Sequence, residues 1–394
     1  MKKICIFCSL SSFGTGMPIS TYKLALGLAG RGRDVCVLLP EEGELAERLR
    51  SAGIDVEIVS FERVKRDFWK RPWSLPAWAA AGWRLYRYVR GNGIGIVHFS
   101  DVIDAPFYPF ARAAGVKVVA HVRVCVDVKA VRYLYRVWAH LFCSRVIAVS
   151  HFVKRRYGFG GRASVVYNPG PDRAVFDRKR YQKSVVDINN VDTDNVINTD
   201  KDNGCPAVIA VSSFRRDKGL HNFAEIAAEI AERRRGAGRA VRFVIVGGKV
   251  AGHEDYYNEV TESARRLGLD KLLTVTGNVK HEDVAARLAG ASVLIHAPDW
   301  EEALGGVVLE AMAMGVAVVA YDSGGVGECF SNGVSGYLVK KGDKLGAAMR
   351  AVSLLNKPEL RENMAAKAEI ELNEKFTNEL YINGVLNVYE KIKK

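Results

Sequence analysis

Residues 293–321 read Val293-Leu-Ile-His-Ala-Pro-Asp-Trp-Glu-Glu-Ala-Leu-Gly-Gly-Val-Val-Leu-Glu-Ala-Met-Ala-Met-Gly-Val-Ala-Val-Val-Ala-Tyr321. The apolar run 293–296 predicts a strand, the segment 306–314 predicts a helix, and the run 317–321 predicts a second strand. A strand, a helix and a strand in this order form a βαβ unit with parallel strands. The stretch therefore predicts a parallel α/β sheet.

The same alternation of strand-like and helix-like segments extends through both halves of the chain. Further strands are predicted at 4–7, 34–39, 56–59, 94–99, 116–122 and 146–149, and then at 207–211, 241–246 and 273–276. Between the two series, residues 184–204 contain five Asn and five Asp, a composition that cannot bury a core. The chain of 394 residues is also too long for one ordinary core. We therefore predict two Rossmann-like domains, with ligands bound outside the carboxyl ends of their strands.

Charge is distributed unevenly between the two halves. Residues 1–183 hold 31 Lys and Arg against 14 Asp and Glu, whereas residues 205–394 hold 25 of each. This asymmetry indicates an anionic partner for the first half: a membrane surface, a charged glycan or nucleic acid. Tryptophans interleave the cations and no nucleic-acid recognition motif is present, so no nucleic-acid partner is expected. The seven scattered cysteines and the lack of a signal peptide or membrane-spanning run indicate a cytoplasmic protein with reduced thiols.

The loop and helix of residues 298–315 carry the strongest chemical signal. Glu302 and Glu310 are separated by eight positions, with Gly305 and Gly306 between them. The glycines allow close backbone approach, and a helix that begins there can donate N–H groups to phosphate. Two carboxylates beside such a helix suit a ligand that carries both hydroxyl groups and a pyrophosphate. The alternative is a buried Glu beside a glycine-rich turn.

This stretch resembles the Glu-x7-Glu donor motif of retaining GT-B glycosyltransferases, and it is most similar to family 4 (group 1). The similarity continues in order through Gly14-Thr-Gly16, Ile147-Ala-Val-Ser150, Tyr167-Asn-Pro-Gly-Pro-Asp172, Phe214-Arg-Arg-Asp-Lys-Gly219, Ser323-Gly-Gly-Val-Gly-Glu328 and Asn332-Gly-Val-Ser-Gly-Tyr-Leu-Val339. The resemblance implies a GT-B fold, two Rossmann-like domains whose parallel sheets face a central cleft. It implies an acceptor-binding domain over 1–183, a linker over 184–204, a nucleotide-sugar-binding domain over 205–372, and a helix over 373–394 that returns to the first domain.

The resemblance also implies roles for individual residues. Glu302 would hold hydroxyl groups of the donor sugar, Glu310 those of the nucleotide ribose, and Lys218 the pyrophosphate. The family usually places an Arg five or six residues before that Lys, but position 213 is Ser, so Arg215 or Arg216 would take its place. His121 would line the catalytic cleft, although a core histidine is the alternative. The implied donor-binding residues are Gly14, Gly16, Arg215, Arg216, Lys218, Glu302, Gly305, Gly306, Val307 and Glu310, and the implied catalytic residues are His121, Glu302 and Lys218.

The expected reaction is transfer of a sugar from a UDP- or GDP-sugar to an acceptor with retention of configuration. No cofactor and no metal site are expected, because no Asp-x-Asp motif is present and relatives of this kind generally work without bound metal. Two other classes of protein stay open. A GT-B epimerase or phosphorylase would share the architecture, and a non-catalytic module would bind nucleotide without turnover.

Residues 63–90 suggest where the protein acts. They hold eight cations, one acid and four of the six tryptophans of the chain. Trp favours the bilayer interface, and Lys and Arg favour anionic headgroups. We therefore expect a peripheral protein on the cytoplasmic face of a membrane, with a lipid-linked or saccharide acceptor and contacts through Trp69, Lys70, Arg71 and Trp73. The alternative is a helical hairpin whose tryptophans pack on the sheet.

Overall fold

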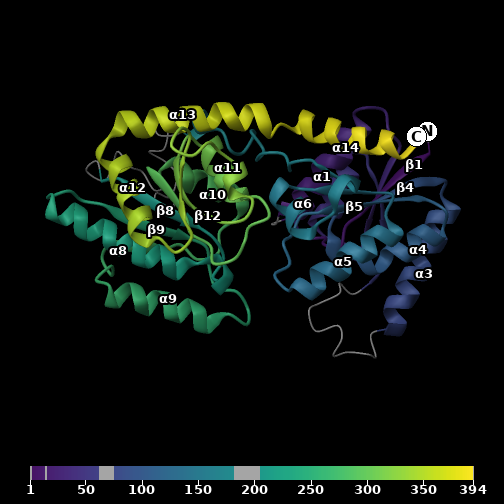
Figure 1. Ribbon diagram of the computed structural model, residues 1–394, viewed down its shortest axis with the longest axis horizontal. Helices are drawn as coiled ribbons and strands as arrows, with labels where there is room; N and C mark the ends of the chain where they lie inside the picture. Colours follow the sequence, from purple (N-terminus) through teal and green to yellow (C-terminus); the bar gives the residue numbers. More distant parts are fainter. Residues whose placement is uncertain (1, 14–15, 62–74, 182–204, 394) are drawn as a thin grey trace. The chain divides into compact units, whose positions relative to one another are not determined.

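A computed structural model describes residues 2–13, 16–61, 75–181 and 205–393 (Figure 1). The chain divides into two compact units. Met1–Pro169 together with Phe376–Lys394 form the first unit, and Gly170–Lys375 form the second. In each unit helices flank a central sheet (Figure 1).

The first unit is built on a sheet of seven parallel strands in the order β3-β2-β1-β4-β5-β6-β7. The strands are β1 (Lys3–Phe7), β2 (Val35–Leu39), β3 (Asp55–Ile58), β4 (Ile94–Phe99), β5 (Lys117–Val122), β6 (Arg145–Ala148) and β7 (Ala163–Val165). β2 is buried at every position, as expected for an inner strand covered on both faces. β3, at the edge, alternates between exposed and half-buried positions.

The second unit is built on six parallel strands in the order β10-β9-β8-β11-β12-β13. These strands are β8 (Ala207–Val211), β9 (Arg242–Val246), β10 (Leu273–Val275), β11 (Val293–His296), β12 (Ala317–Asp322) and β13 (Tyr337–Lys340). The prediction of two Rossmann-like parallel sheets is confirmed. The sequence did not predict the edge strands β7 and β13, which have only three and four residues.

Helices lie between most successive strands of each unit, and three further helices follow the last strand of the second sheet. In the first unit they are α1 (Gly16–Ala29), α2 (Glu44–Ser51), α3 (Leu75–Gly91), α4 (Tyr108–Ala113), α5 (Lys129–Phe142), α6 (His151–Tyr157) and α14 (Asn378–Lys393). In the second unit they are α8 (Leu220–Gly236), α9 (Glu254–Arg266), α10 (His281–Ala289), α11 (Gly306–Ala313), α12 (Lys344–Asn356) and α13 (Pro358–Lys375). None of these described helices combines the length and apolar character needed to cross a membrane.

The boundary between the units differs from the predicted position at residue 183. Residues 170–181 pack with the second unit. Arg173 donates to the Ala313 carbonyl at 3.0 Å and to Glu369 at 2.5 Å, and the Phe176 ring lies 5.1 Å from His281. These contacts hold the segment to α10, α11 and α13, whereas the sequence marks only the Asn- and Asp-rich stretch that follows.

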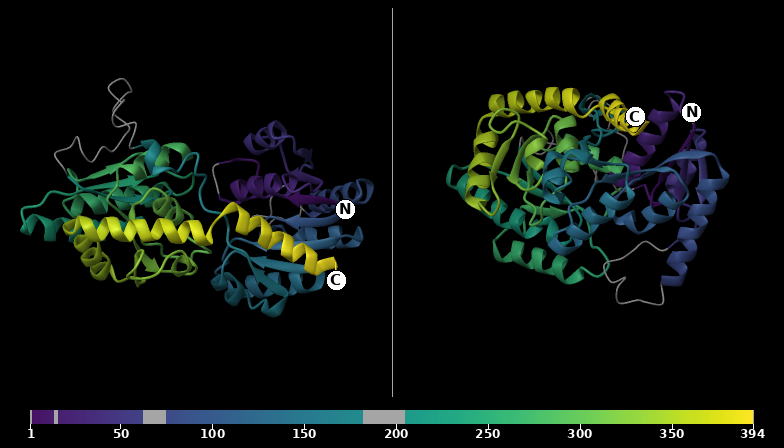
Figure 2. Two further views of the ribbon diagram at one scale, coloured as in Figure 1. Left: turned by 90° about the horizontal axis from the view of Figure 1, so that it is seen from above. Right: turned by 45° about the vertical axis from the view of Figure 1, so that its right-hand side comes forward.

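The last helix belongs to the first unit. Figure 2 shows the chain leaving α13 and continuing into α14. Tyr381, Ile382 and Tyr389 of α14 are buried in the same hydrophobic core as Leu24 of α1. Gly27 of α1 is required for this close approach, because a Cβ there would lie 2.4 Å from the Ile382 side chain.

Candidate active site

The second sheet has a topological switch point between β8 and β11. From β8 the chain moves outward through β9 to β10, and from β11 it moves the other way through β12 to β13. The loops that leave the carboxyl ends of two such neighbouring strands splay apart and form a ligand crevice. Lys218 lies in the loop after β8, and Glu302 lies in the loop after β11.

These two loops are joined by backbone and side-chain hydrogen bonds. The Asp299 N–H donates to the Asp217 carbonyl at 3.1 Å. Asn222, in the first turn of α8, donates to the Ala297 carbonyl at 3.1 Å and to the Asp299 carboxylate at 2.8 Å. Gly219 has φ +69°, and a Cβ there would lie 2.1 Å from the Ala297 carbonyl oxygen. The glycine therefore permits the close contact that places Lys218 beside the second loop.

Lys218 and Glu302 form a partly buried ion pair. Lys218 Nζ lies 2.9 Å from Glu302 Oε1, and the two side chains are 23% and 14% exposed. The ammonium also lies 4.9 Å from the centre of the Trp300 ring. Burial alone would raise the pKa of Glu302, but the Lys218 ammonium, His296 and a hydrogen bond from Trp300 together outweigh burial, and the pKa is lowered. Glu302 is therefore a carboxylate at neutral pH.

One buried polar atom beside this pair, His296 Nε2, has no hydrogen-bond partner among the described residues. His296 Nε2 lies 3.9 Å from Glu302 Oε1. Burial lowers the pKa of His296 to about 4, so its ring is neutral at pH 7. Leaving a buried donor unsatisfied costs about 1–3 kcal/mol. A bound ligand rich in oxygen atoms would supply the missing partner.

Backbone geometry fixes Glu302 against the loop after β12. Gly324 has φ +67°, and a Cβ there would lie 2.1 Å from the Glu302 carbonyl oxygen. The Gly325 N–H donates to that oxygen at 2.7 Å. A few residues further along, α11 begins at Gly306, so the N–H groups of Gly306 and Val307 lie in the open first turn, where anions bind.

Glu310 lies in the second turn of α11 and is held from α10. His281 Nε2 is 3.0 Å from Glu310 Oε1, and the Glu310 side chain is 18% exposed. The sequence singled out neither His281 nor His296. His296 at the end of a buried strand was a usable signal, whereas His281 gave none, because it begins a helix 29 residues before Glu310.

Arg215 and Arg216 are each already paired with a carboxylate. Arg215 binds Asp217 through two hydrogen bonds of 2.7 and 3.1 Å. Arg216 binds Glu259 with both terminal nitrogens and lies 5.0 Å from the centre of the Tyr256 ring. A phosphate would have to displace these carboxylates, so the role of either Arg at the phosphate stays a prediction.

The comparisons with known proteins agree with this geometry. Residues 192–370 match the family described as Glycosyl transferases group 1, and residues 14–169 match the one described as Glycosyltransferase Family 4. The two matches follow one another and together cover most of the chain. This chain belongs to the group 1/family 4 glycosyltransferases.

Two relatives of this glycosyltransferase chain illustrate the family. The alpha-D-kanosaminyltransferase of Streptomyces kanamyceticus is 34% identical over 163 residues, which are 41% of this chain and 40% of the relative. The N-acetyl-alpha-D-glucosaminyl L-malate synthase of Bacillus anthracis is 28% identical over 186 residues, 46% of this chain and 44% of the relative. The matched stretches thus span less than half the length of either relative.

A solved structure shows the GT-B fold of this glycosyltransferase. Anabaena HepE in complex with UDP and glucose superposes with a TM-score of 0.79 at 19% identity, over 99% of this chain and all of that one. The predicted fold class is therefore confirmed. At this level of identity the comparison shows the fold alone.

In the first unit of the glycosyltransferase, the predicted site residues are only partly described. His121 lies in β5 and is fully buried, with Nδ1 3.3 Å from His98 Nε2, and its Nε2 has no hydrogen-bond partner among the described residues. Gly16 is the first residue of α1. Five other predicted residues lie outside the described residues: Gly14, Trp69, Lys70, Arg71 and Trp73.

Proposed function

We propose that this chain transfers a sugar from a nucleotide-sugar donor, in the first instance a UDP-sugar, to an acceptor with retention of anomeric configuration. The observation that carries the proposal is the Lys218–Glu302 pair at the switch point, with the buried His296 Nε2, unpartnered among the described residues, beside it. HepE was solved with UDP and glucose, which supports the choice of UDP.

The chemistry follows from the charges of the second unit. Departure of a nucleoside diphosphate develops negative charge on a phosphate oxygen, and a preorganised cation lowers the cost of that charge. Lys218 supplies the ammonium, and the first turn of α11 supplies N–H groups. Glu302 accepts hydrogen bonds from sugar hydroxyl groups, and His296 can bind a further oxygen atom. Metal-independent turnover stays a prediction.

The test is acceptor-dependent turnover. A thermal-shift panel of UDP, GDP, UDP-glucose, UDP-N-acetylglucosamine and GDP-mannose identifies the donor, since a ligand at a hundredfold excess over Kd stabilises the fold by about 2.7 kcal/mol. We expect release of UDP only when a lipid-linked saccharide extract is added. Donor turnover without acceptor would indicate an epimerase, and binding without any turnover would indicate a non-catalytic module.

Glu310→Gln should weaken the binding of free UDP, because ribose contacts exist without the sugar. Losing a charged hydrogen bond costs about 1.5–3 kcal/mol, so Kd should rise by roughly 10- to 150-fold in calorimetry. Glu371→Gln is the matched control. Glu371 is also largely buried and bonded to Ser335 and Lys375 of the second unit, so its replacement should leave Kd unchanged. Equal Kd values for Glu310→Gln and the native protein would remove Glu310 from the site.

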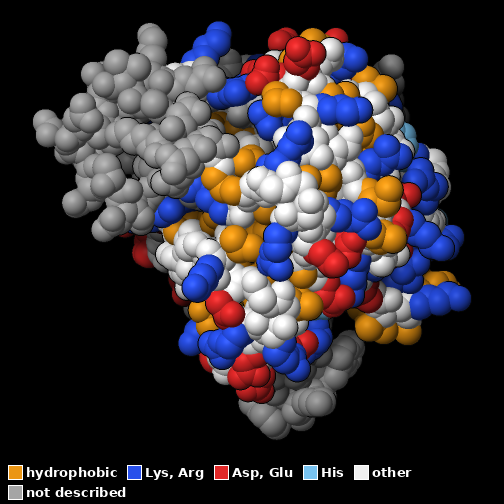
Figure 3. Space-filling view, turned by 90° about the vertical axis from the view of Figure 1, so that its left-hand side faces the viewer, with side chains coloured by type: hydrophobic (Ala, Val, Ile, Leu, Met, Phe, Trp, Pro, Cys, Tyr) orange, Lys and Arg blue, Asp and Glu red, His pale blue; other side chains and the backbone are white. Residues whose placement is uncertain are grey.

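We also propose that the first unit binds an anionic membrane surface and that the acceptor is lipid-linked. Besides the cations counted above, α3 exposes Trp83 at 56%, stacked on Tyr86. α5 exposes Tyr133, Leu134 and Leu141 at 64, 42 and 61%. α4 contacts both α3 and α5, so the three helices lie on one face of the sheet. Figure 3 shows a different face of the molecule, the left-hand side of Figure 1, where acidic and basic side chains are interspersed.

Liposome flotation tests this proposal. Binding should require anionic lipid and should decrease as salt rises, because each Lys or Arg near such a surface contributes about 1 kcal/mol that salt screens. Replacing Trp69, Lys70, Arg71 and Trp73 together should reduce binding, and so should replacing Leu134 and Leu141 by serine. Leu345 and Met349 of α12 are 49 and 54% exposed in the second unit, so their serine variants are the control. A folded protein that ignores anionic vesicles at low salt would contradict the membrane proposal and leave the transferase proposal intact.

A further inference from the structure

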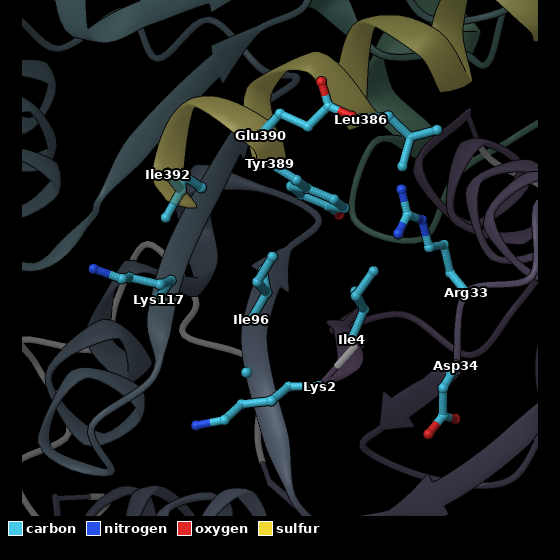
Figure 4. A pocket seen from close by; sticks show the side chains of 11 residues that line it. Lys2, Ile4, Arg33, Asp34, Ile96, Lys117, Leu386, Tyr389, Glu390 and Ile392 are labelled. Carbon is cyan, nitrogen blue, oxygen red and sulfur yellow. The ribbon is translucent and has the colours of Figure 1, made fainter. Parts of the chain in front are cut away.

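A chain of buried hydrogen bonds runs from the last helix to His121. The hydroxyl group of Tyr389, in α14, lies 2.7 Å from His98 Nδ1. His98 Nε2, in β4, lies 3.3 Å from His121 Nδ1 in β5. Tyr389 is 3% exposed, and both histidines are fully buried. Figure 4 shows the Tyr389 ring extending from α14 over Ile4 and Ile96 of the strands below.

The protonation states of the three groups follow from their surroundings. Burial and the nearby Arg123 guanidinium lower the pKa of both histidines well below the usual value. Burial raises the pKa of Tyr389 well above its usual value. Each imidazole is therefore neutral with one N–H, and the tyrosine is a neutral phenol. Two neutral rings that share one hydrogen bond must be arranged as donor and acceptor in sequence.

Only two arrangements of the protons satisfy both hydrogen bonds. In the first, Tyr389 donates to His98 Nδ1, His98 donates from Nε2 to His121 Nδ1, and His121 carries its proton on Nε2. In the second, His121 donates from Nδ1 to His98 Nε2, and His98 donates from Nδ1 to the Tyr389 oxygen. His121 Nε2 then carries no proton and is an acceptor. Among the described residues Tyr389 has no hydrogen-bond partner other than His98, so the reversed arrangement leaves the phenol O–H unsatisfied. A buried, unsatisfied donor costs about 1–3 kcal/mol, which favours the first arrangement.

The walls around Tyr389 agree with this choice. The ring borders a hollow of about 300 Å³ beneath α14, which is lined by apolar side chains and by the charged residues Lys2, Arg33, Asp34, Lys117 and Glu390 (Figure 4). Among the described residues the Tyr389 hydroxyl group makes no hydrogen bond to either carboxylate of this lining, Asp34 or Glu390. Tyr389 therefore donates its proton to His98 Nδ1. His98 must then donate from Nε2 to His121 Nδ1, which leaves the His121 proton on Nε2.

We propose that Tyr389 and His98 are positioning residues that hold His121 as an Nε2–H tautomer, so that its unpartnered Nε2–H donates a hydrogen bond to an oxygen atom of the substrate. This inference rests on the proposed function, because it names the substrate contact of a predicted catalytic residue. It assigns His121 the role of a hydrogen-bond donor and excludes that of a general base, since Nε2 has no free lone pair in this tautomer. It also gives α14 a part in the chemistry of the first unit.

Nuclear magnetic resonance of the full-length protein labelled with ¹⁵N-histidine reads the tautomer directly. His121→Gln assigns the His121 signal among the eight histidines of the chain. We expect the native protein to show His121 protonated at Nε2 and Tyr389→Phe to show a mixture of both tautomers. Protonation of the native His121 at Nδ1 would overturn the inference.

Kinetics provide the second measurement. Losing one neutral hydrogen bond in the transition state corresponds to about a tenfold decrease in rate. Tyr389→Phe should therefore lower kcat about tenfold and leave KM for the UDP-sugar within about twofold of the native value. His98→Gln keeps one donor and one acceptor and should retain more activity than His98→Leu. Tyr108→Phe is the control, because it removes an equally buried hydroxyl group that bonds only to the Asp101 carbonyl. It should keep both kcat and the His121 tautomer.

The outcomes separate this inference from the proposed function. If the native protein is active and Tyr389→Phe has the same kcat and the same His121 tautomer, the relay, meaning the hydrogen-bond chain from Tyr389 through His98 to His121, is contradicted and the proposed function is not. A native protein that transfers no sugar from any donor in the panel would contradict the proposed function, and the tautomer measurement would then decide the relay by itself. A loss of kcat in Tyr108→Phe equal to that in Tyr389→Phe would show that any buried hydroxyl matters, and would also contradict the relay.

Discussion

Glu302→Ala should lower sugar transfer by about 10²–10³-fold, the loss typical of removing one preorganised charged contact from a transition state. The carboxylate is held by Lys218 at 2.9 Å, and the Glu302 backbone is held by the close approach of Gly324, so the side chain is oriented before a ligand binds. UDP binding should survive, because the ribose contacts are expected at Glu310. Coupled detection of released UDP measures the rate of sugar transfer, and calorimetry measures the Kd for UDP.

Two variants make this result interpretable. Glu302→Gln keeps the shape of the side chain and its acceptor oxygen but removes the charge that neutralises Lys218. Its rate of sugar transfer should therefore lie between those of the alanine variant and the native protein. Glu225→Gln breaks an exposed ion pair with Lys344 in the same unit and should keep full activity. Native turnover in Glu302→Ala would show that the Lys218–Glu302 pair is a structural ion pair and that the proposed active site is wrong.

The two sheets could be predicted because their inner strands are continuous apolar runs. β2 and β11 are buried at every position, and such runs are visible without any partner. β13 is different, because it has one buried position and lies at the sheet edge. The start of α1 is hard to recognise in the sequence, because the helix begins at Gly16 and carries Pro18, two residues that normally discourage a helix but are tolerated in its first turn.

The residues of the candidate site that are close in sequence form one visible motif, whereas Lys218 is placed beside them only by the family resemblance. Glu302, Gly305 and Gly306 lie in one short motif. Trp300 lies in the same motif, but its role depends on a contact with Lys218, 82 residues earlier in the chain. The partner of Arg216 is Glu259, 43 residues away, so only the fold reveals that this guanidinium is occupied.

The division between the compact units also depends on contacts that are distant in sequence. The Asn- and Asp-rich stretch over 184–204 is conspicuous in composition, and the sequence placed the division there. The contacts of Arg173 with Ala313 and Glu369 connect residues about 140 and 196 positions apart. A change in composition marks a solvated segment, whereas a boundary between compact units depends on such long-range contacts.

Acidification should destabilise the fold well before its carboxylates titrate. His98, His121 and His296 are buried and neutral, and burial lowers the pKa of each below its usual value. The unfolded chain therefore binds more protons than the folded chain below about pH 6.5, so the free energy of unfolding falls as pH falls. The loss begins near that pH and continues until the folded pKa is reached, which is about 4 for His296.

Each such histidine contributes a slope that rises from half of about 1.4 kcal/mol per pH unit at pH 6.5 towards the full value, so all three together give about 3 kcal/mol between pH 6.5 and 5.5. Urea unfolding at pH 7.0, 6.5, 6.0 and 5.5 measures this slope. His98→Gln should reduce it by about one third, because glutamine does not titrate, whereas His253→Gln, at an exposed position, should leave it unchanged. A flat profile between pH 7.0 and 5.5 would mean that the buried rings take up protons as readily as free histidine. The Nε2–H of His121 could then not persist as a neutral donor, so this measurement also bears on the relay from Tyr389.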